Sequence, residues 1–261
     1  MRLAYGELIG GVSGDMFVAA LIDLGVPLGK LKSELRKIPT LKFDLKASKK
    51  LVHSIRASQF HVVCPANDSP RSFKQIRELI ERSRLAAEVK NTGLNIFSKL
   101  AEAEAKIHGV AVDKVHFHEV GATDSIVDIM AVAIGIRELE ISALHFSRIP
   151  LGHGVTRSMH GPLPVPGPAT LELLKGLPTF GIDLESETVT PTGAAIVTTL
   201  GISFGDQPSM KIDKIGYGAG RKEFPNRPNL FRLSVGASSI GLKHEEIIVL
   251  AKVERSPRQL P

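Results

Sequence analysis

The sequence predicts an α/β protein in which a mixed sheet is flanked by helices and glycine-rich turns lead from strands into helices. The chain opens with an apolar, strand-like segment at residues 1–9, which is followed by the glycine-rich residues 10–16 and by a helix at 17–24. A second turn of this kind, at residues 189–195, again leads from a strand into a helix. Further along the chain, strand-like segments recur between helical ones, as is typical of α/β proteins.

The remaining elements follow from local patterns taken in chain order. We expect helices where apolar residues recur at helical spacing between capping, glycine and proline residues, at 28–38, 72–85, 86–108, 126–136 and 169–175. We expect strands where β-branched and aromatic residues alternate with polar ones, at 43–47, 54–64, 115–119, 143–149, 229–235 and 246–253. Residues 1–240 form the predicted α/β region, with two subdomains meeting near 150–168 as an alternative, and residues 241–261 are expected to be a linker or tail.

The composition predicts a globular protein of the cytoplasm. Of the 261 residues, 43% are apolar and 23% are charged, which is ordinary for a soluble domain. The sequence has no apolar run long enough to span a membrane and shows no signal-peptide pattern, so we expect no membrane association. The single cysteine, Cys64, excludes an internal disulfide and any site with several thiolates from one chain.

The net charge of +6 favours an anionic small molecule over a nucleic acid as the partner. Basic residues are scattered among acidic ones, as in residues 71–84, where glutamates interleave with lysines and arginines. The chain also has only two tyrosines and no tryptophan, so it lacks the basic and aromatic stripe on which nucleic-acid bases would stack. We therefore expect no nucleic-acid partner.

The densest group of metal-capable side chains lies in residues 115–128. In an extended chain His116 and His118 leave on the same face, and Glu119 follows them. Asp124 and Asp128 share one face of the next helix, and Asp128 lies inside an apolar run, where a carboxylate is costly unless it is paired or bound to a metal. Imidazole with carboxylates suits nickel, zinc or copper, so this stretch indicates a divalent-metal or acid–base site.

A second source of imidazoles is the proline-rich stretch at residues 150–168. Prolines at alternate positions exclude a helix and favour an extended loop, and this loop contains His153 and His160. A rigid loop that carries histidines is one way to complete a metal site from outside the sheet. We therefore count His153 and His160 among the candidate metal ligands.

Three glycine-rich turns are candidates for binding an anion. A helix that begins at such a turn presents free backbone amides, which bind phosphate or carboxylate groups. The candidate substrate-binding residues come from residues 10–16, 189–195 and 215–222, and they are Ser13, Gly14, Asp15, Thr190, Thr192, Gly193, Gly218 and Arg221.

Each of these patterns also has an ordinary structural explanation, which the sequence alone leaves open. Residues 115–128 could be a strand with solvated histidines and a helix capped by Thr123 or Asp124. The proline-rich stretch could be a linker between subdomains. The first glycine-rich turn could be a tight turn capped by Ser13 or Asp15, and the third could be a flexible hairpin.

Four motifs in one order resemble a known family. They are residues 11–16 (GVSGDM), 116–122 with 124–128 (HFHEVGA and DSIVD), 190–195 (TPTGAA) and 216–220 (GYGAG). Together they look like the LarC family, the nickel-insertion protein of nickel-pincer cofactor biosynthesis, from residue 1 to about residue 253. The resemblance implies that nickel is inserted into pyridinium-3,5-bisthiocarboxylic acid mononucleotide, a nucleotide-like small molecule, in a lyase-class reaction that forms a carbon–nickel bond and consumes CTP.

The resemblance also implies roles and partners. Loss of the ring proton needs a base, and His118 or Glu119 is the candidate catalytic residue. Family members usually continue into a C-terminal domain associated with nucleotide binding and oligomer assembly. We therefore expect CTP with Mg or Mn to be bound by that domain, here missing or supplied by a separate polypeptide, and we expect a homo-oligomer.

The chain departs from the family pattern at two places. Where the family usually has an Asp-Cys pair before the first glycine-rich turn, this chain has Glu7 and Leu8, so a thiol role there is absent. The end of the chain, residues 256–261, does not resemble the start of the C-terminal domain, so the chain alone could bind nickel without turnover. Two other functions remain as alternatives: a non-catalytic nickel delivery protein, and a metal-dependent hydrolase of a phosphorylated small molecule.

Overall fold

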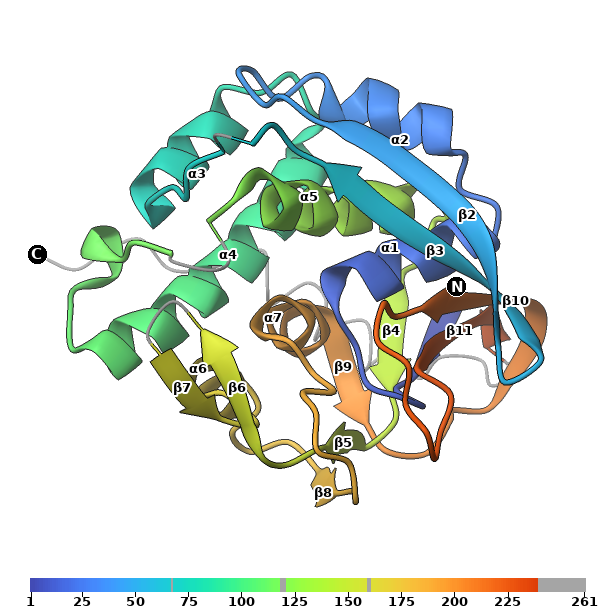
Figure 1. Cartoon of the computed structure of the whole chain (residues 1–261). Coiled ribbons are helices and arrows are strands. Elements are labelled where there is room, and N and C mark those ends of the chain that lie inside the picture. Colours follow the sequence, from blue (N-terminus) through green and yellow to red (C-terminus); the bar gives the residue numbers. More distant parts are fainter. Residues whose placement is uncertain (67, 118–120, 159–160, 239–261) are drawn as a thin grey trace, which may run out of the picture.

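A seven-stranded mixed sheet forms the frame of the protein in the computed structural model, which describes residues 1–66, 68–117, 121–158 and 161–238 (Figure 1). Its strands are β1 (Arg2–Glu7), β2 (Asp44–Val52), β3 (Ile55–Val63), β4 (Ala143–Phe146), β9 (Gly201–Phe204), β10 (Met210–Ala219) and β11 (Leu230–Ser238). They lie in the order β2-β3-β10-β11-β1-β4-β9. The pairs β2–β3, β10–β11 and β1–β11 are antiparallel, whereas β3–β10, β1–β4 and β4–β9 are parallel.

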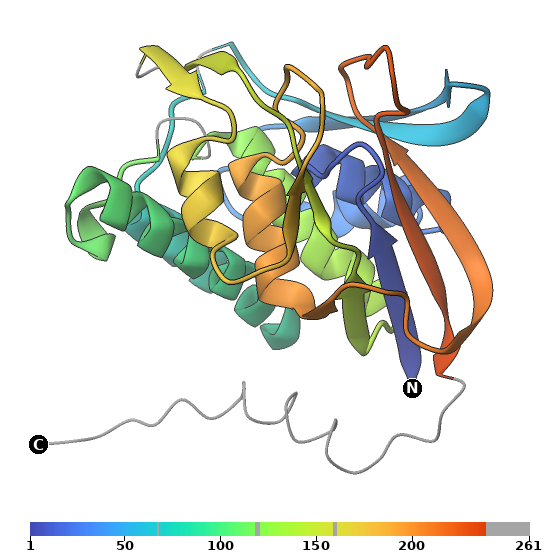
Figure 2. The same ribbon diagram turned by 90° about the horizontal axis from the view of Figure 1, so that it is seen from below.

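The main helices lie on one side of the strands β1, β10 and β11 (Figure 2). Their bounds are α1 (Gly14–Asp23), α2 (Leu28–Leu35), α3 (Phe73–Glu81), α4 (Ala87–His108), α5 (Thr123–Glu138), α6 (Pro168–Leu173) and α7 (Pro191–Leu200), with a 3-10 turn at Val112–Lys114. Helix α1 packs directly on β3, β10 and β11, α5 packs on α1, and α4 packs on α5. This architecture confirms the predicted α/β class with a mixed sheet flanked by helices.

Three buried aromatic rings fix α1 over the centre of the sheet. The ring of Phe17 in α1 stacks on Phe231 of β11 at a centroid distance of 4.9 Å, and it meets Phe146 of β4 edge-on at 6.3 Å. Such ring pairs add to the free energy of burying the apolar surface. As a result the N-terminus of α1 sits just beyond the carboxyl end of β1, the edge at which α/β sheets commonly bind ligands.

The third glycine-rich stretch is a strand and not the predicted turn. Gly216 and Gly218 lie in β10, where a Cβ on either residue would collide with backbone oxygens of α1. Glycine is therefore needed here because the helix lies almost in contact with the strand. The turn itself begins only at Gly220. Gly218 therefore has a packing role in the strand, and the substrate-binding role predicted for it stays a prediction.

The proline-rich stretch also differs from the expected loop. It contains β5 (Ile149–Leu151), which pairs with β8 (Thr179–Gly181), and a hairpin of β6 (Val155–Ser158) and β7 (Gly161–Pro164). Proline fits these two-stranded pieces because each strand has an open edge that needs no amide donor. The boundary that could have separated two subdomains falls between β4 and β9, which are neighbours in one sheet.

Two further expectations concern the ends of elements and the tail. Helix α4 ends, as predicted, at Gly109, which has a left-handed φ of 64°. The expected strand at 246–253 and the tail at 241–261 lie outside the described residues. Within the described ranges no helix has the length and apolar character needed to cross a bilayer.

Candidate substrate and metal site

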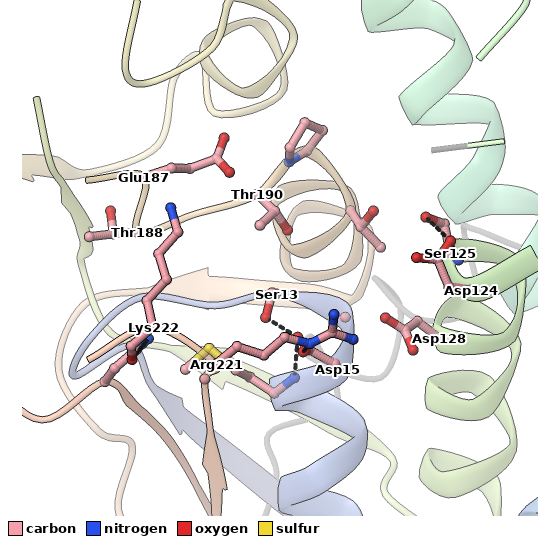
Figure 3. Close-up of a pocket in the computed structure, with 16 residues that line it drawn as sticks. Ser13, Asp15, Asp124, Ser125, Asp128, Glu187, Thr188, Thr190, Arg221 and Lys222 are labelled. Carbon is pink, nitrogen blue, oxygen red and sulfur yellow. Dashed lines mark hydrogen bonds and ion pairs between the residues drawn. The ribbon is translucent and has the colours of Figure 1, made fainter. Parts of the chain in front are cut away.

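Residues from four separately predicted motifs line one cavity of about 340 Å³ (Figure 3). The cavity lies where the N-termini of α1, α5 and α7 meet the turn between β10 and β11. The predicted site residues that line it are Ser13, Gly14, Asp15, Asp124, Asp128, Thr190, Thr192 and Arg221. The structure thus joins carboxylates expected at a metal site to turns expected at an anion site.

Backbone contacts hold the first two glycine-rich turns together. The amide of Val12 donates to the carbonyl of Thr188 at 2.9 Å, and the amide of Thr190 donates to the carbonyl of Val12 at 3.2 Å. A Cβ on Gly11, which has φ of +114°, or on Gly193 would collide with these same backbone strands. Gly193 therefore supports the site by close packing and does not line the cavity.

Asp15 is held in the first turn of α1 by several partners. Its carboxylate accepts hydrogen bonds from the hydroxyl of Ser13 and from the amide of Met16, the latter at 2.9 Å. The guanidinium Nε of Arg221 lies 3.4 Å from the other carboxylate oxygen. Asp15 therefore has a fixed orientation and a counter-charge, and it ties the turn after β10 to the start of α1.

Asp128 is the least satisfied carboxylate of the cavity. It is partly buried, and among the described residues neither a hydrogen bond nor an ion pair is found for it. Burial raises the pKa of Asp128 well above its ordinary value, the nearby charges of Asp15 and Asp124 raise it further, and Arg221 lowers it only in part. A cation entering the cavity would therefore be attracted to Asp128.

The N-terminus of α5 is capped differently from the prediction. The N-cap residue is Ala122, and neither Thr123 nor Asp124 occupies that position. Instead the carboxylate of Asp68 accepts bonds from the amide and the hydroxyl of Thr123, at 2.6 and 2.8 Å. Asp68 thus takes over the capping role from a distant part of the chain, which leaves the Asp124 side chain to accept a bond from the Ser125 amide at 2.7 Å.

The other predicted metal ligands that the structure describes do not line this cavity. His116 is exposed and forms one isolated bridge with Ser72, so the expected strand at 115–119 is reduced to this pairing as far as the described residues show. His153 is exposed, and its Nε2 lies 3.4 Å from Asp183. His118, Glu119 and His160 lie outside the described residues.

The described residues by themselves do not complete a metal site. Among them, no group of three or more histidine, cysteine, aspartate or glutamate side chains is placed to hold an ion. Described residues on either side of 118–120 are bonded to residues at the start of α3 and just before it. Val115 accepts from the Phe73 amide at 3.1 Å, and Gly121 accepts from the Arg71 amide at 3.0 Å. The metal-ligand set therefore stays a prediction.

Several lining residues were not among the predicted ones. Glu187, Thr188 and Asn229 line the cavity, and so does Lys222, which the sequence showed only as a cation next to Arg221. Glu187 and Thr188 directly precede the second glycine-rich turn, and this position was the signal that could have revealed them. Asn229 is buried, and its amide donates to the Lys222 carbonyl at 3.0 Å, which shapes the turn after β10.

Comparisons with known proteins show the family of the chain. The model of a family described as nickel insertion protein matches residues 4–253. A protein of Geotalea daltonii, named provisionally as a nickel insertion protein, is 46% identical over 252 residues, which are 96% of this chain and 65% of that protein. A protein of Geobacillus kaustophilus, named pyridinium-3,5-bisthiocarboxylic acid mononucleotide nickel insertion protein, is 45% identical over 90% of this chain and 60% of its own length.

The chain spans about 65% of the length of the relatives that it matches most fully. No solved structure matches it significantly. The family match covers nearly the whole chain and includes each motif that contributes to the cavity. The chain therefore belongs to the nickel insertion protein family.

Proposed function

We propose that this chain binds Ni²⁺ and pyridinium-3,5-bisthiocarboxylic acid mononucleotide in the cavity and brings them together so that a carbon–nickel bond forms. Support for the substrate comes from the name of the Geobacillus kaustophilus relative. Support for the place comes from the chemistry of the cavity, which combines carboxylates with cations and helix N-termini. Nickel is here a substrate that is handed to the mononucleotide.

The observation that carries this proposal is the meeting of the α5 carboxylates with two anion-type turns in one cavity. Asp124 and Asp128 offer oxygen ligands to a divalent ion. The free amides at the starts of α1 and α7 favour a negatively charged group. A substrate that carries a phosphate and must also meet Ni²⁺ needs both environments within one small volume.

The reaction itself is a replacement of a proton by nickel. The bond from the ring carbon to hydrogen breaks, its electron pair forms the bond to Ni²⁺, and the proton passes to a base, so no external oxidant is needed. The predicted base is His118 or Glu119. The predicted nickel ligands are His116, His118, Asp124, Asp128, His153 and His160.

CTP dependence belongs to a further part of the proposal. The relatives extend beyond the matched region, and we infer that CTP with Mg or Mn is bound by a C-terminal domain or by a separate partner polypeptide. Turnover of this lyase-class reaction would then require that domain, whereas the binding of nickel and mononucleotide would not. We also propose a cytoplasmic homo-oligomer as the working form.

Calorimetric titration of the protein with Ni²⁺ tests the metal assignment. We expect tight binding by the wild type and a loss of binding in a His116→Ala/His118→Ala double variant. His145→Ala is the matched control, because His145 lies on β4 and its ring bonds to Ser203 at 2.7 Å, outside the cavity. Nickel binding that survives in the double variant would contradict the assignment to this stretch.

A titration with the mononucleotide distinguishes the proposed insertase from the two alternatives. A nickel delivery protein would bind Ni²⁺ but not the mononucleotide. A hydrolase would release phosphate from a phosphorylated substrate without CTP. Formation of a nickel-containing product only when CTP and the C-terminal domain are supplied would support the insertase.

A further inference from the structure

We propose that the phosphate of the mononucleotide binds at one defined end of the cavity, between the N-termini of α1 and α7, in contact with Ser13, Thr192 and Lys222. The pyridinium ring then points toward Asp124 and Asp128 at the other end. This inference rests on the proposed function, which names the substrate, and adds the orientation in which it binds. Figure 3 shows Lys222, Ser13 and Thr190 on one side and Asp124 and Asp128 on the other.

Thr192 provides the most specific contact point for a ligand. The residue is only 7% exposed, it lines the cavity, and among the described residues its hydroxyl has no hydrogen-bond partner. The hydroxyl is not among the fully buried polar atoms that lack a partner, so it opens onto the cavity, where a phosphate oxygen can accept its hydrogen bond. Because Thr192 is in the first turn of α7, its backbone amide also lacks an acceptor within the helix.

The next two amides of this turn already donate hydrogen bonds within the protein, so they are not available to a phosphate. The hydroxyl of Thr190 accepts from the Gly193 amide at 3.1 Å, and the Thr190 carbonyl accepts from the Ala194 amide at 2.8 Å. The free donors of α7 are therefore those of Thr192. They lie beside the first turn of α1, because a Cβ on Gly193 would be 3.0 Å from the Cα of Ser13.

Lys222 supplies the positive charge at this end. Its ammonium group lies 3.3 Å from the Ser186 hydroxyl, and among the described residues it has no ion pair. Arg221, by contrast, is engaged with Asp15 at 3.4 Å. Lysine is a common phosphate-binding residue when it stands next to a helix N-terminus. Of the two cations among the described lining residues, Lys222 is therefore the one whose charge is not already paired.

Charge at the two ends fixes the direction of the substrate. Asp124 and Asp128 would repel a phosphate but attract the positive pyridinium ring and Ni²⁺. Two further carboxylates line the cavity, Asp15 and Glu187, and the charge of Asp15 is offset by Arg221. The phosphate is therefore expected at the end with Lys222 and the ring at the end with Asp124 and Asp128.

The test compares two probes that differ only in the phosphate, nicotinic acid mononucleotide and nicotinic acid riboside, titrated calorimetrically without nickel. We expect Thr192→Val and Lys222→Met each to weaken the mononucleotide about tenfold or more, because each loses a bond to a charged group. Binding of the riboside should stay within about twofold. Inorganic phosphate should compete with the mononucleotide but not with the riboside.

Matched controls separate local effects from misfolding. Thr198→Val makes the same change on α7 at a residue outside the cavity, whose hydroxyl bonds to the Ala195 carbonyl, and Lys211→Met does so for an exposed lysine of β10. Both should bind like the wild type. Thr192→Ser keeps the hydroxyl and should restore the affinity that Thr192→Val loses.

Other outcomes would overturn the orientation. An equal loss for both probes, no loss in either variant, or no binding of the mononucleotide would each refute the phosphate position. These results are independent of nickel. Ni²⁺ binding at residues 115–128 together with mononucleotide binding that does not depend on the phosphate would refute only this inference. Phosphate-dependent binding of the mononucleotide without Ni²⁺ binding would refute the proposed function but not the orientation.

Discussion

Replacing Asp128 by asparagine should stabilise the protein at neutral pH while weakening its hold on nickel. Burial raises the pKa of Asp128 in the folded state, and the charges of Asp15 and Asp124 add to this effect. Between the ordinary carboxyl pKa and the raised one, the folded protein binds more protons than the unfolded chain. Stability therefore falls as the pH rises through this window, and Asp128→Asn removes that fall.

The size of the effect follows from linkage. For each pH unit by which the pKa is raised, the protein loses about 1.4 kcal/mol of stability once Asp128 is ionised. One kcal/mol corresponds to about 2–4 °C in Tm for a domain of this length. The melting temperature of Asp128→Asn should therefore match the wild type near pH 4 and exceed it by several degrees near pH 8.

Scanning calorimetry between pH 4 and pH 8 measures this difference. Asp213→Asn is a suitable control, because Asp213 is exposed on β10 and lies outside the cavity. The reasoning would be refuted if Asp128→Asn melted below the wild type across the whole range. That result would mean that the Asp128 carboxylate is stabilised as an anion.

Addition of Ni²⁺ separates stability from function in the same experiment. A ligand at 100 times its Kd adds about 2.7 kcal/mol of stability to the state that binds it. We expect Ni²⁺ to raise the Tm of the wild type and of the Asp213→Asn control. It should raise the Tm of Asp128→Asn less, although that variant starts from a higher value.

Three further predictions follow from the same region. Asp68→Ala should lower stability in urea denaturation by about 1 kcal/mol, since it removes the cap of α5, and an unchanged midpoint would contradict that role. Gly14→Ala should cost about 1–3 kcal/mol because a Cβ there would be 2.7 Å from Asp128 Oδ2, whereas Gly29→Ala, with nothing within 4 Å, should cost nothing; equal effects in thermal melts would argue against the contact. Burial, with nearby carboxylates, raises the pKa of the Cys64 thiol, so its alkylation by iodoacetamide, followed by mass spectrometry, should need a higher pH than that of free cysteine, and alkylation at a lower pH would be the opposite result.

Periodicity predicted the elements but not their pairing. The sequence indicated helix α5 from its apolar run and the end of α4 from Gly109, because both signals are local. The pairing of β10 with β3 joins residues far apart in the chain, and no local signal encodes it. For the same reason Gly216 and Gly218 looked like a turn, since glycine within a strand is explained only by the helix above it.

In the candidate site, too, local signals predicted the single residues but not how they come together. Each glycine-rich turn and each carboxylate of α5 could be predicted singly, because the residue types report their own chemistry. Their convergence depends on the sheet order, which places the turns that follow β1 and β10 at the same edge of the sheet. Asp68 could not be predicted as the cap of α5, because it reaches Thr123 across 55 positions of sequence.

A comparison of two carboxylates supports the choice of this cavity as the candidate site. Burial alone would raise the pKa of Asp23, at the end of α1, but bonds from Lys49, Tyr217 and Ser58 bring it below its ordinary value. Asp128, across from the other end of α1, has no such partner among the described residues, although a lysine or amide there would stabilise the fold. Asp23 is thus satisfied by partners within the fold, whereas Asp128 is left without one among the described residues, as expected if a cation binds beside it.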